Sequence, residues 1–245
     1  MRRRLHSSKQ ANLVTQHDIK LELDVRSQKL IEKTLHSAFP DVAFLGEEGT
    51  TGQMDADYRW VVDPIDGTVN FAYGIPHACV SIALQGRARD SKSAEFEDGY
   101  ETLVGVVYDP FCDELWTAIR GEPARLNGKL ILVSKRRRLQ DSIVAIGFAK
   151  SRESLEHTLP YFVKLVRRVR KIRMMGSAAL ALTYVASGRF DAYVERGISL
   201  WDVAAGGLIL ECAGGEFWHR AVKGYYKHRM VSSNGLLRRH LRVPN

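Results

Sequence analysis

Two aspartates three residues apart could bind a cation together. They are Asp63 and Asp66 in the segment WVVDPIDGTVNF, which ends an apolar run and leads into Gly67-Thr68. Two carboxylates in one turn repel each other unless cations lie between them. Mg²⁺ takes oxygen ligands of this kind, together with waters and a substrate phosphate. The turn therefore predicts a site for hard divalent cations.

The neighbours of the two aspartates favour an anion at the same place. Pro64 fixes its own φ and biases Asp63 toward an extended conformation, and Gly67 lets the backbone approach a ligand closely. A helix beginning at Gly67-Thr68 would point free N–H groups at a phosphate. The same residues also fit an ordinary aspartate-rich turn in which Asp66 caps a helix. The motif alone leaves both interpretations open.

Further acidic residues lie at the ends of apolar elements. They are Glu47 and Glu48 in GEEG, Asp202 in WDVAAG, Glu195 at the end of DAYVE, and Asp18 in LVTQHD. Each also fits a helix cap or a surface charge. Because α/β folds gather their active sites where strands end, the placement of these residues favours one shared site.

The elements that must position these residues follow from the apolar pattern. Helices are expected over 19–39, 153–168, 177–187 and 202–212. Strands are expected over 42–45, 58–62, 77–84, 103–108, 114–119, 143–148, 190–195 and 230–233. Strands and helices that alternate in this way indicate an α/β layered fold.

The connections between these elements also carry information. The polar stretch 87–101 predicts an exposed hairpin loop, and Asn127-Gly128 predicts a tight turn. With 245 residues the chain suits one large domain or two small ones. Any boundary between two halves is expected near 135–142.

Composition limits the class of protein. The formal net charge of +8 could favour anionic partners, although the basic clusters at 2–4, 135–138, 167–173 and 238–239 fit a solvated surface. Cys79, Cys112 and Cys212 form no CxxC pair and lie in apolar stretches, which predicts reduced, buried cysteines in a cytoplasmic protein. Neither a membrane span of about 20 apolar residues nor a secretory signal is predicted.

Taken together, the motifs resemble the inositol monophosphatase family of Mg²⁺-dependent, lithium-sensitive sugar phosphatases. The segments are GEEG at 46–49, WVVDPIDGTVNF at 60–71, GSAALALTYVASGRFDAYVE at 176–195, WDVAAG at 201–206 and, more weakly, LVTQHD at 13–18. The resemblance spans about residues 12–240 and implies an α+β layered sandwich of αβαβα order. Only twelve residues precede LVT, so either the family's usual first helix is missing or the true start of the chain lies upstream.

The resemblance also implies a division of the single domain 1–245 and a set of metal ligands. The half over about 12–138 would hold the larger sheet and metal-binding residues, and 139–245 the second sheet and substrate-side residues. One Mg²⁺ would bind Glu47, Asp63 and the carbonyl of Ile65. A second would bind Asp63, Asp66 and Asp202, so that Asp63 bridges the pair. A third, weaker ion is expected near Glu47.

Catalytic and substrate-binding roles follow from the same resemblance. Thr68 would pair with Asp18 to orient the water that attacks phosphorus in line, with Glu47 as a further catalytic residue. The backbone amides of Gly67 and Thr68 would bind phosphate oxygens. The polyol would meet a surface formed by Gly176, Ser177, Ala178 and Glu195, with Asp66 and Asp202 beside it.

Several functions stay open at this point. The segments GSAAL and DAYVE favour hydrolysis of inositol 1-phosphate by a cytoplasmic homodimer. Fructose 1,6-bisphosphate and histidinol phosphate are alternative substrates, and Asn70-Phe71 argues against a nucleotide 3′-phosphate. The alternative from another class is a non-catalytic role in binding RNA or the transcription machinery, which the basic stretch 166–173 supports. The chain lacks the interleaved aromatic and basic residues of RNA platforms, so catalysis is favoured.

Overall fold

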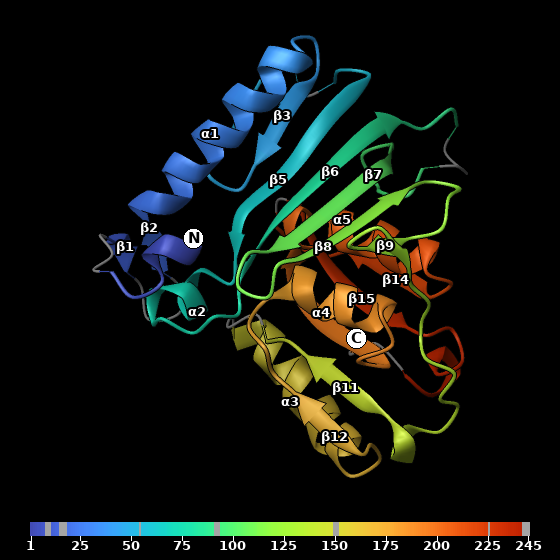
Figure 1. Cartoon of the computed structure of the whole chain (residues 1–245). Coiled ribbons are helices and arrows are strands. Elements are labelled where there is room, and N and C mark those ends of the chain that lie inside the picture. Colours follow the sequence, from blue (N-terminus) through green and yellow to red (C-terminus); the bar gives the residue numbers. More distant parts are fainter. Residues whose placement is uncertain are drawn as a thin grey trace.

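Five layers follow one another through the molecule. The computed structural model describes residues 1–7, 11–14, 19–53, 55–90, 94–148, 152–224 and 226–241. In Figure 1 the layers run from α1 (Glu22–Ala38) to the larger sheet, then to α4 (Ala178–Ala186) with α5 (Leu200–Cys212), then to the smaller sheet, and last to α3 (Arg152–Val166). The predicted α+β sandwich of αβαβα order is confirmed.

In the part of the chain that is described, the larger sheet has eight strands in the order β10-β9-β8-β7-β6-β5-β3-β4. Their bounds are β3 (Ala43–Gly46), β4 (Gly49–Thr51), β5 (Tyr58–Asp66), β6 (Cys79–Arg87), β7 (Tyr100–Asp109), β8 (Glu114–Ile119), β9 (Arg125–Leu126) and β10 (Lys129–Leu130). Strands β3 and β5 run parallel, and the other neighbours run antiparallel. Asn127 and Gly128, with φ of 48° and 76°, form the expected tight turn between β9 and β10.

The smaller sheet has the order β12-β11-β13-β15-β14. Its strands are β11 (Ile143–Ile146), β12 (Lys171–Arg173), β13 (Ala192–Ser199), β14 (Glu216–Ala221) and β15 (Lys227–Ser233). β11 runs parallel to both neighbours, whereas β15 runs antiparallel to β13 and β14. The remaining elements are β1 (Ala11–Val14), β2 (Ile19–Leu21), α2 (Thr68–Ala72) and the short 3₁₀ turns Arg2–Arg4, Leu139–Asp141 and Arg238–His240.

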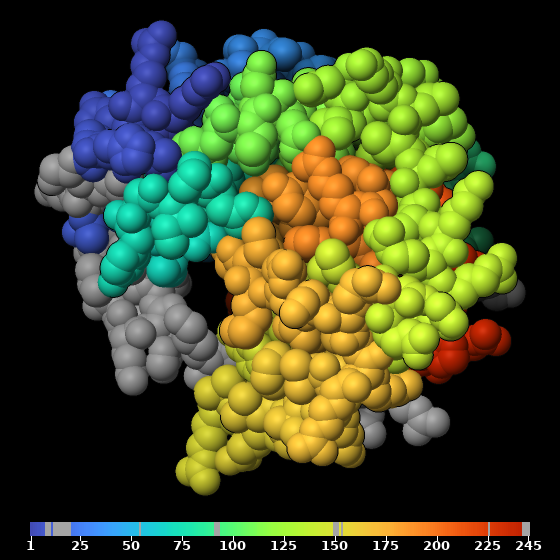
Figure 2. Space-filling view, turned by 60° about the horizontal axis from the view of Figure 1, so that its bottom comes forward, coloured from blue at the N-terminus to red at the C-terminus, as the bar shows by residue number. Residues whose placement is uncertain are grey.

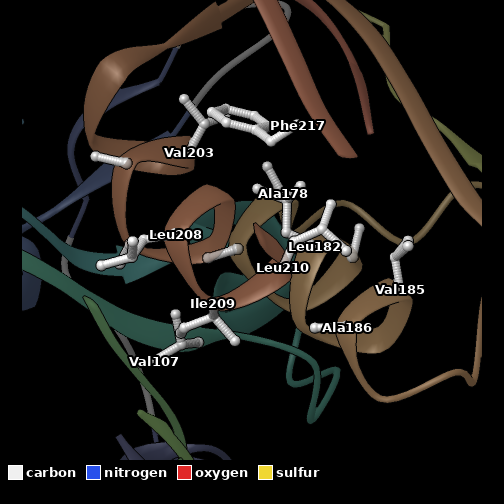
Figure 3. Packing of buried hydrophobic residues seen from close by; sticks show 14 of the residues in the cluster. Val107, Ala178, Leu182, Val185, Ala186, Val203, Leu208, Ile209, Leu210 and Phe217 are labelled. Carbon is white, nitrogen blue, oxygen red and sulfur yellow. The ribbon is translucent and has the colours of Figure 1, made fainter. Parts of the chain in front are cut away.

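The main hydrophobic core surrounds α4 and α5 between the two sheets. Figure 3 shows Leu182 of α4 and Ile209 of α5 among side chains from both sheets, including Val107 and Phe217. A helix enclosed on both sides is apolar around its whole circumference, which explains the run of small and aliphatic residues in both helices. A Cβ added at Gly105 of β7 would lie 2.7 Å from the carbonyl oxygen of Ala205. The backbone of α5 therefore lies directly against the larger sheet.

The structure differs from the sequence prediction at several elements, among them α1, β12 and β14. The helix expected over 19–39 begins only at Glu22, because residues 19–21 pair with β1 as the strand β2. The basic cluster 167–173 contains the strand β12, which pairs with β11. The strand β14 was not predicted, since its sequence EFWHRA combines apolar and charged residues without a clean alternation.

The stretch 87–101 is not wholly exposed, so that prediction was wrong. Phe96 is 3% exposed within it. The backbone N–H groups of Glu95 and Phe96 both donate to the carbonyl of Tyr100 at 3.0 Å, which folds the loop back on itself. The loop thereby carries an aromatic ring into the protein.

The cysteines and the helix lengths bear on the remaining expectations. Cys79 is buried, Cys212 is partly buried and Cys112 is exposed, so the prediction of three buried cysteines was wrong for Cys112, which lies in the turn between β7 and β8. Within the described ranges, no helix has the length and apolar character needed to cross a membrane.

Candidate metal and phosphate site

The end of β5 turns two aspartates to the same side of the larger sheet. Asp63 pairs with Ser81 of β6 and Asp66 pairs with Cys79, so three steps along β5 match two along β6. In a regular strand, residues an odd number apart point to opposite faces. The one extra residue is a β-bulge, which returns Asp66 to the face of Asp63. The bulge therefore explains how a strand ends with two neighbouring carboxylates.

Asp202 completes a group of three carboxylates with these two. One oxygen from each of Asp63, Asp66 and Asp202 lies within 4.8 Å of the others. Burial raises the pKa of Asp63 well above its usual range, and the charges of Glu47, Asp66 and Asp202 raise it further. Such a group holds protons unless cations are present to replace them.

Asp66 is also held by the start of α4. Its carboxylate accepts hydrogen bonds from the Ser177 hydroxyl at 2.6 Å and from the amides of Ala178 and Ala179 at 3.2 and 2.7 Å. These donors favour the charged carboxylate. Burial and the charge of Asp202 outweigh them and raise the pKa of Asp66 to about 7. The N-terminal groups of α4 thus orient this carboxylate.

Asp202 lies in the first turn of α5. Its carboxylate accepts a hydrogen bond at 3.0 Å from the backbone N–H of Ser199, the residue before the helix. The Lys227 ammonium donates to the Ser199 hydroxyl at 2.6 Å. Burial raises the pKa of Asp202, while the Ser199 amide and the Lys227 charge lower it. Sequence reasoning did not predict that the Lys227 charge acts on this carboxylate.

Gly67 and Thr68 form the turn that follows the carboxylates. Gly67 has φ of +94°, and a Cβ there would lie 2.9 Å from the carbonyl oxygen of His77, so this position requires glycine. The Thr68 hydroxyl donates to the carbonyl of Ile65 at 2.9 Å. A carbonyl oxygen has two lone pairs, so Ile65 keeps one for a cation.

A cavity of about 410 Å³ opens over this turn. Asn70 links the segment that follows α2 to the segment that precedes α4, because its side-chain amide donates to the carbonyls of His77 at 2.9 Å and Met175 at 2.8 Å. Figure 2 shows the surface hollowed between the teal segment that contains α2 and the light-orange segment that leads into α4. The cavity is large enough for a small phosphorylated molecule.

Glu195 of β13 lines the same cavity from the smaller sheet. It accepts a hydrogen bond from the Tyr193 hydroxyl, and burial raises its pKa to about 7. A Cβ added at Gly147 would lie 1.7 Å from Oε2 of Glu195. Gly147 therefore makes the space that this carboxylate occupies.

The structure brings the predicted site residues together, with one outside the described part. The cavity is lined by Glu47, Asp63, Ile65, Asp66, Gly67, Thr68, Gly176, Ser177, Ala178, Glu195 and Asp202. Glu47 stands apart from the closest group of carboxylates, and Asp18 lies outside the described residues. Sequence reasoning missed Tyr193, Gly147 and Lys227, for which the motifs carry no signal.

The donor set decides which ion fits. The closest group consists of carboxylate oxygens alone, with the carbonyl of Ile65 in the same cavity, and hard divalent cations prefer such ligands. A layered fold with this group at a strand end, facing a cavity of metabolite size, defines a metal-dependent phosphatase. The chain belongs to the inositol monophosphatase family, which matches residues 1–241.

Individual relatives agree with this assignment. The Nus factor SuhB of Pasteurella multocida is 39% identical over 208 residues, covering 84% of this chain and 73% of its own. The inositol-1-monophosphatase of Rhizobium meliloti is 38% identical over 217 residues, covering 88% and 76%. The crystal structure of the extragenic suppressor protein suhB from Bartonella henselae superposes with a TM-score of 0.84 at 34% identity, covering 97% of this chain and 89% of that one.

Proposed function

We propose that the chain hydrolyses inositol 1-phosphate to inositol and phosphate, with Mg²⁺ as its cofactor. The observation that carries this proposal is the group of buried carboxylates, Asp63, Asp66 and Asp202, at the wall of the cavity that Glu195 also lines. A relative named inositol-1-monophosphatase covers 88% of the chain. Phosphate and polyol thus have separate places, one beside the carboxylates and one toward the smaller sheet.

We assign the metal ligands from this arrangement. Glu47, Asp63 and the Ile65 carbonyl would hold one ion; Asp63, Asp66 and Asp202 would hold another. When bound, divalent cations lower the pKa of water and neutralise charge on a transferred phosphoryl group. The raised pKa values of Asp63 and Asp66 agree with a site that is complete only with cations.

The residues of the chain then bind and orient the substrate. The amides of Gly67 and Thr68 would donate to phosphate oxygens, and Thr68 would orient the attacking water, with Asp18 as its expected partner. Glu195 would accept hydrogen bonds from adjacent hydroxyls of the polyol, with Gly176 beside it. Ser177 and Ala178, which we also expect to meet the polyol, donate to Asp66 in this structure, so they would hold that ligand as well.

The test is phosphate release by the purified chain from a panel of esters, with and without Mg²⁺. Inositol 1-phosphate, fructose 1,6-bisphosphate and histidinol phosphate cover the alternatives. Release from inositol 1-phosphate that requires Mg²⁺ and falls with Li⁺ supports the proposal. A folded protein that releases phosphate from none of the esters would refute it. Preference for another ester would keep the reaction and change the substrate.

A second candidate function is binding to RNA or the transcription machinery. A relative that covers 84% of the chain is named Nus factor SuhB. Arg137, Arg238 and Arg239 line one hollow together, close to the end of β15. Binding through such a surface would weaken steeply with salt. Salt-dependent RNA binding that the substitution of these arginines by glutamine abolishes would establish it, and phosphatase activity would be unchanged.

The assembly state has its own test. The family resemblance leads us to propose a homodimer. Light scattering of the purified chain with and without Mg²⁺ would measure its mass, and a mass of about 27.6 kDa, that of one chain, would refute the dimer.

A further inference from the structure

A second group of possible metal ligands lies on β14 and β15. Ala221 pairs with His228 in this antiparallel hairpin, and His219 is two residues before Ala221. Because side chains alternate along a strand, His219 and His228 share one face. Their ring centroids lie 5.3 Å apart with the planes at 78°. The pairing of the two strands therefore places two imidazoles in contact.

The loop between β6 and β7 adds a carboxylate to the two imidazoles. One Glu97 oxygen accepts a hydrogen bond from the Ala221 backbone N–H at 2.5 Å. The other lies 3.8 Å from Nδ1 of His228. One ligand atom from each of Glu97, His219 and His228 lies within 4.8 Å of the other two. The carboxylate is thus anchored on the strand and faces the rings.

Both imidazoles have a nitrogen without a partner. Nδ1 of His219 and Nδ1 of His228 are buried and make no hydrogen bond to any described residue, and His228 is only 4% exposed. A buried polar atom without a partner is unfavourable and calls for an explanation. Burial lowers the pKa of both rings, that of His219 to about 4. At neutral pH these rings are therefore neutral, the form that binds metals.

Aromatic side chains fix the geometry of the pair. Phe96 stacks on His219 with centroids 4.6 Å apart, and Phe217 lies 4.9 Å from the same ring. Phe96 also packs on His228 with the two ring planes nearly perpendicular and the centroids 5.6 Å apart. Rings held in this way lose little further freedom when they bind an ion.

An ion from solvent can reach this group. A cavity of about 130 Å³ is lined by Glu97, His228 and Lys227, and the Glu97 side chain is 50% exposed. The Lys227 ammonium is bound to the Ser199 hydroxyl. Asp98, whose carboxylate pairs with Arg59 at 2.7 Å, adds negative charge on the side of His228.

We propose that His219, His228 and Glu97 form a binding site for a divalent transition-metal ion of the zinc class, separate from the carboxylate site. Two imidazoles and one carboxylate are ligands that zinc takes in proteins, with a fourth position left for water. Mg²⁺ prefers oxygen alone and coordinates imidazole poorly. The two sites therefore select different ions.

The experiment uses Co²⁺ as a coloured substitute for Zn²⁺ on the full, metal-free chain. Excess Mg²⁺ is added first, so that the carboxylate site is saturated. We expect one equivalent of Co²⁺ to give the visible absorption of tetrahedral coordination, and Zn²⁺ to remove it by competition. His219→Ala and His228→Ala should each weaken binding at least about tenfold, and Glu97→Gln should weaken it less.

Two matched variants serve as controls. His157→Ala removes an exposed histidine of α3, and Asp202→Asn removes a carboxylate of the other site, so both should keep the absorption. Absorption that Mg²⁺ abolishes, or that survives both histidine variants, would overturn the proposal. If the histidine variants fail to fold, NMR of the histidine rings in the unaltered protein decides. One equivalent of Zn²⁺ must shift two ring signals, and unchanged signals would refute the site.

Discussion

The two groups of ligands differ in how burial acts on them. In the carboxylate group of β5 and α5, burial raises the pKa of Asp63, Asp66 and Asp202, which favours protonation when no cation is present. On β14 and β15, burial lowers the pKa of two imidazoles, so they lose their protons. Burial thus favours the neutral form in both groups, but only in the carboxylate group do protons compete with an ion for the ligands near neutral pH.

The difference teaches that one buried environment can prepare sites for different ions. Oxygen donors from β5 and α5 suit a hard cation such as Mg²⁺. Nitrogen donors from the β14–β15 hairpin suit a cation of intermediate softness such as Zn²⁺. The carboxylates come from segments far apart in sequence, such as Asp63 and Asp202, whereas His219 and His228 lie on adjacent strands.

The largest effect is expected from Asp202→Asn. The amide oxygen can still accept the Ser199 N–H, but the charge that would hold the cation is lost. Loss of a metal ligand removes several kcal/mol of charge stabilisation, so phosphate release should fall on the order of a hundredfold or more. Steady-state kinetics at saturating Mg²⁺ measure it. The exposed Asp41→Asn is the matched control, and equal activity in both variants would contradict the assignment.

A smaller effect is expected from pH. Because the pKa of Asp66 is about 7 without metal, the apparent affinity for Mg²⁺ should fall about tenfold from pH 8 to pH 6, as protons compete for the carboxylate. Because the pKa values of these carboxylates are raised in the folded chain, the folded chain without metal binds more protons than the unfolded chain between about pH 4 and 7. The free energy of unfolding of the metal-free chain should therefore fall as pH rises through that range.

Thermal unfolding with and without Mg²⁺ checks the pH prediction. The increase in Tm on adding Mg²⁺ should be larger at pH 8 than at pH 6. A Zn²⁺-dependent increase, measured with Mg²⁺ in excess, should change much less over the same range, because burial lowers the pKa of both imidazoles, that of His219 to about 4. Equal pH dependence for both ions would remove the contrast between the sites.

Gly147→Ala is expected to act on substrate binding. The new methyl group would collide with the Glu195 carboxylate and displace it from the cavity wall. The KM for inositol 1-phosphate should rise roughly fivefold, the worth of one hydrogen bond of about 1 kcal/mol. The KM for p-nitrophenyl phosphate, which has no polyol, should stay the same. A parallel rise for both esters would mean that Glu195 does not contact the polyol.

The smallest effect is expected from His228→Phe. It replaces a buried imidazole whose Nδ1 has no described partner with an apolar ring. Without transition metal, the free energy of unfolding should rise by roughly 1 kcal/mol. With Zn²⁺ present, the unaltered protein should become the more stable one. Urea unfolding in both conditions measures this reversal. A loss of stability without metal would show that the nitrogen is satisfied.

The sequence made the carboxylate site predictable to a large extent. DPIDGT, GEEG and WDVAAG each place an acidic residue at the end of an apolar element, and the cavity is lined by all three segments. The role of α4 could not be predicted, because the Ser177 hydroxyl and the Ala178 and Ala179 amides reach Asp66 from more than 110 residues away. Contacts of this kind depend on the packing of layers and leave no local pattern. The division into halves stays a prediction.

The histidine pair could not be predicted for a different reason. His219 and His228 are separated by the turn of a hairpin, and the strand β14 that aligns them has no clear alternation. The segment 87–101 looked like a solvated loop, because its charged residues outnumber its two aromatic residues, Phe96 and Tyr100, both of which are buried. Side chains that act across a sheet become visible only when the register of the strands is known.

The β-bulge in β5 constrains how many residues can lie between the two aspartates of the DPID turn. Asp63 and Asp66 point to the same face because exactly one residue beyond the regular pairing with β6 lies between them. Deleting either Pro64 or Ile65 would restore the regular alternation at a spacing of two, whereas inserting a second residue would send one carboxylate to the opposite face. The number of residues in this turn is therefore under stronger constraint than their identity. Natural variants of the chain should exchange Ile65 readily and hardly ever change the length of the turn.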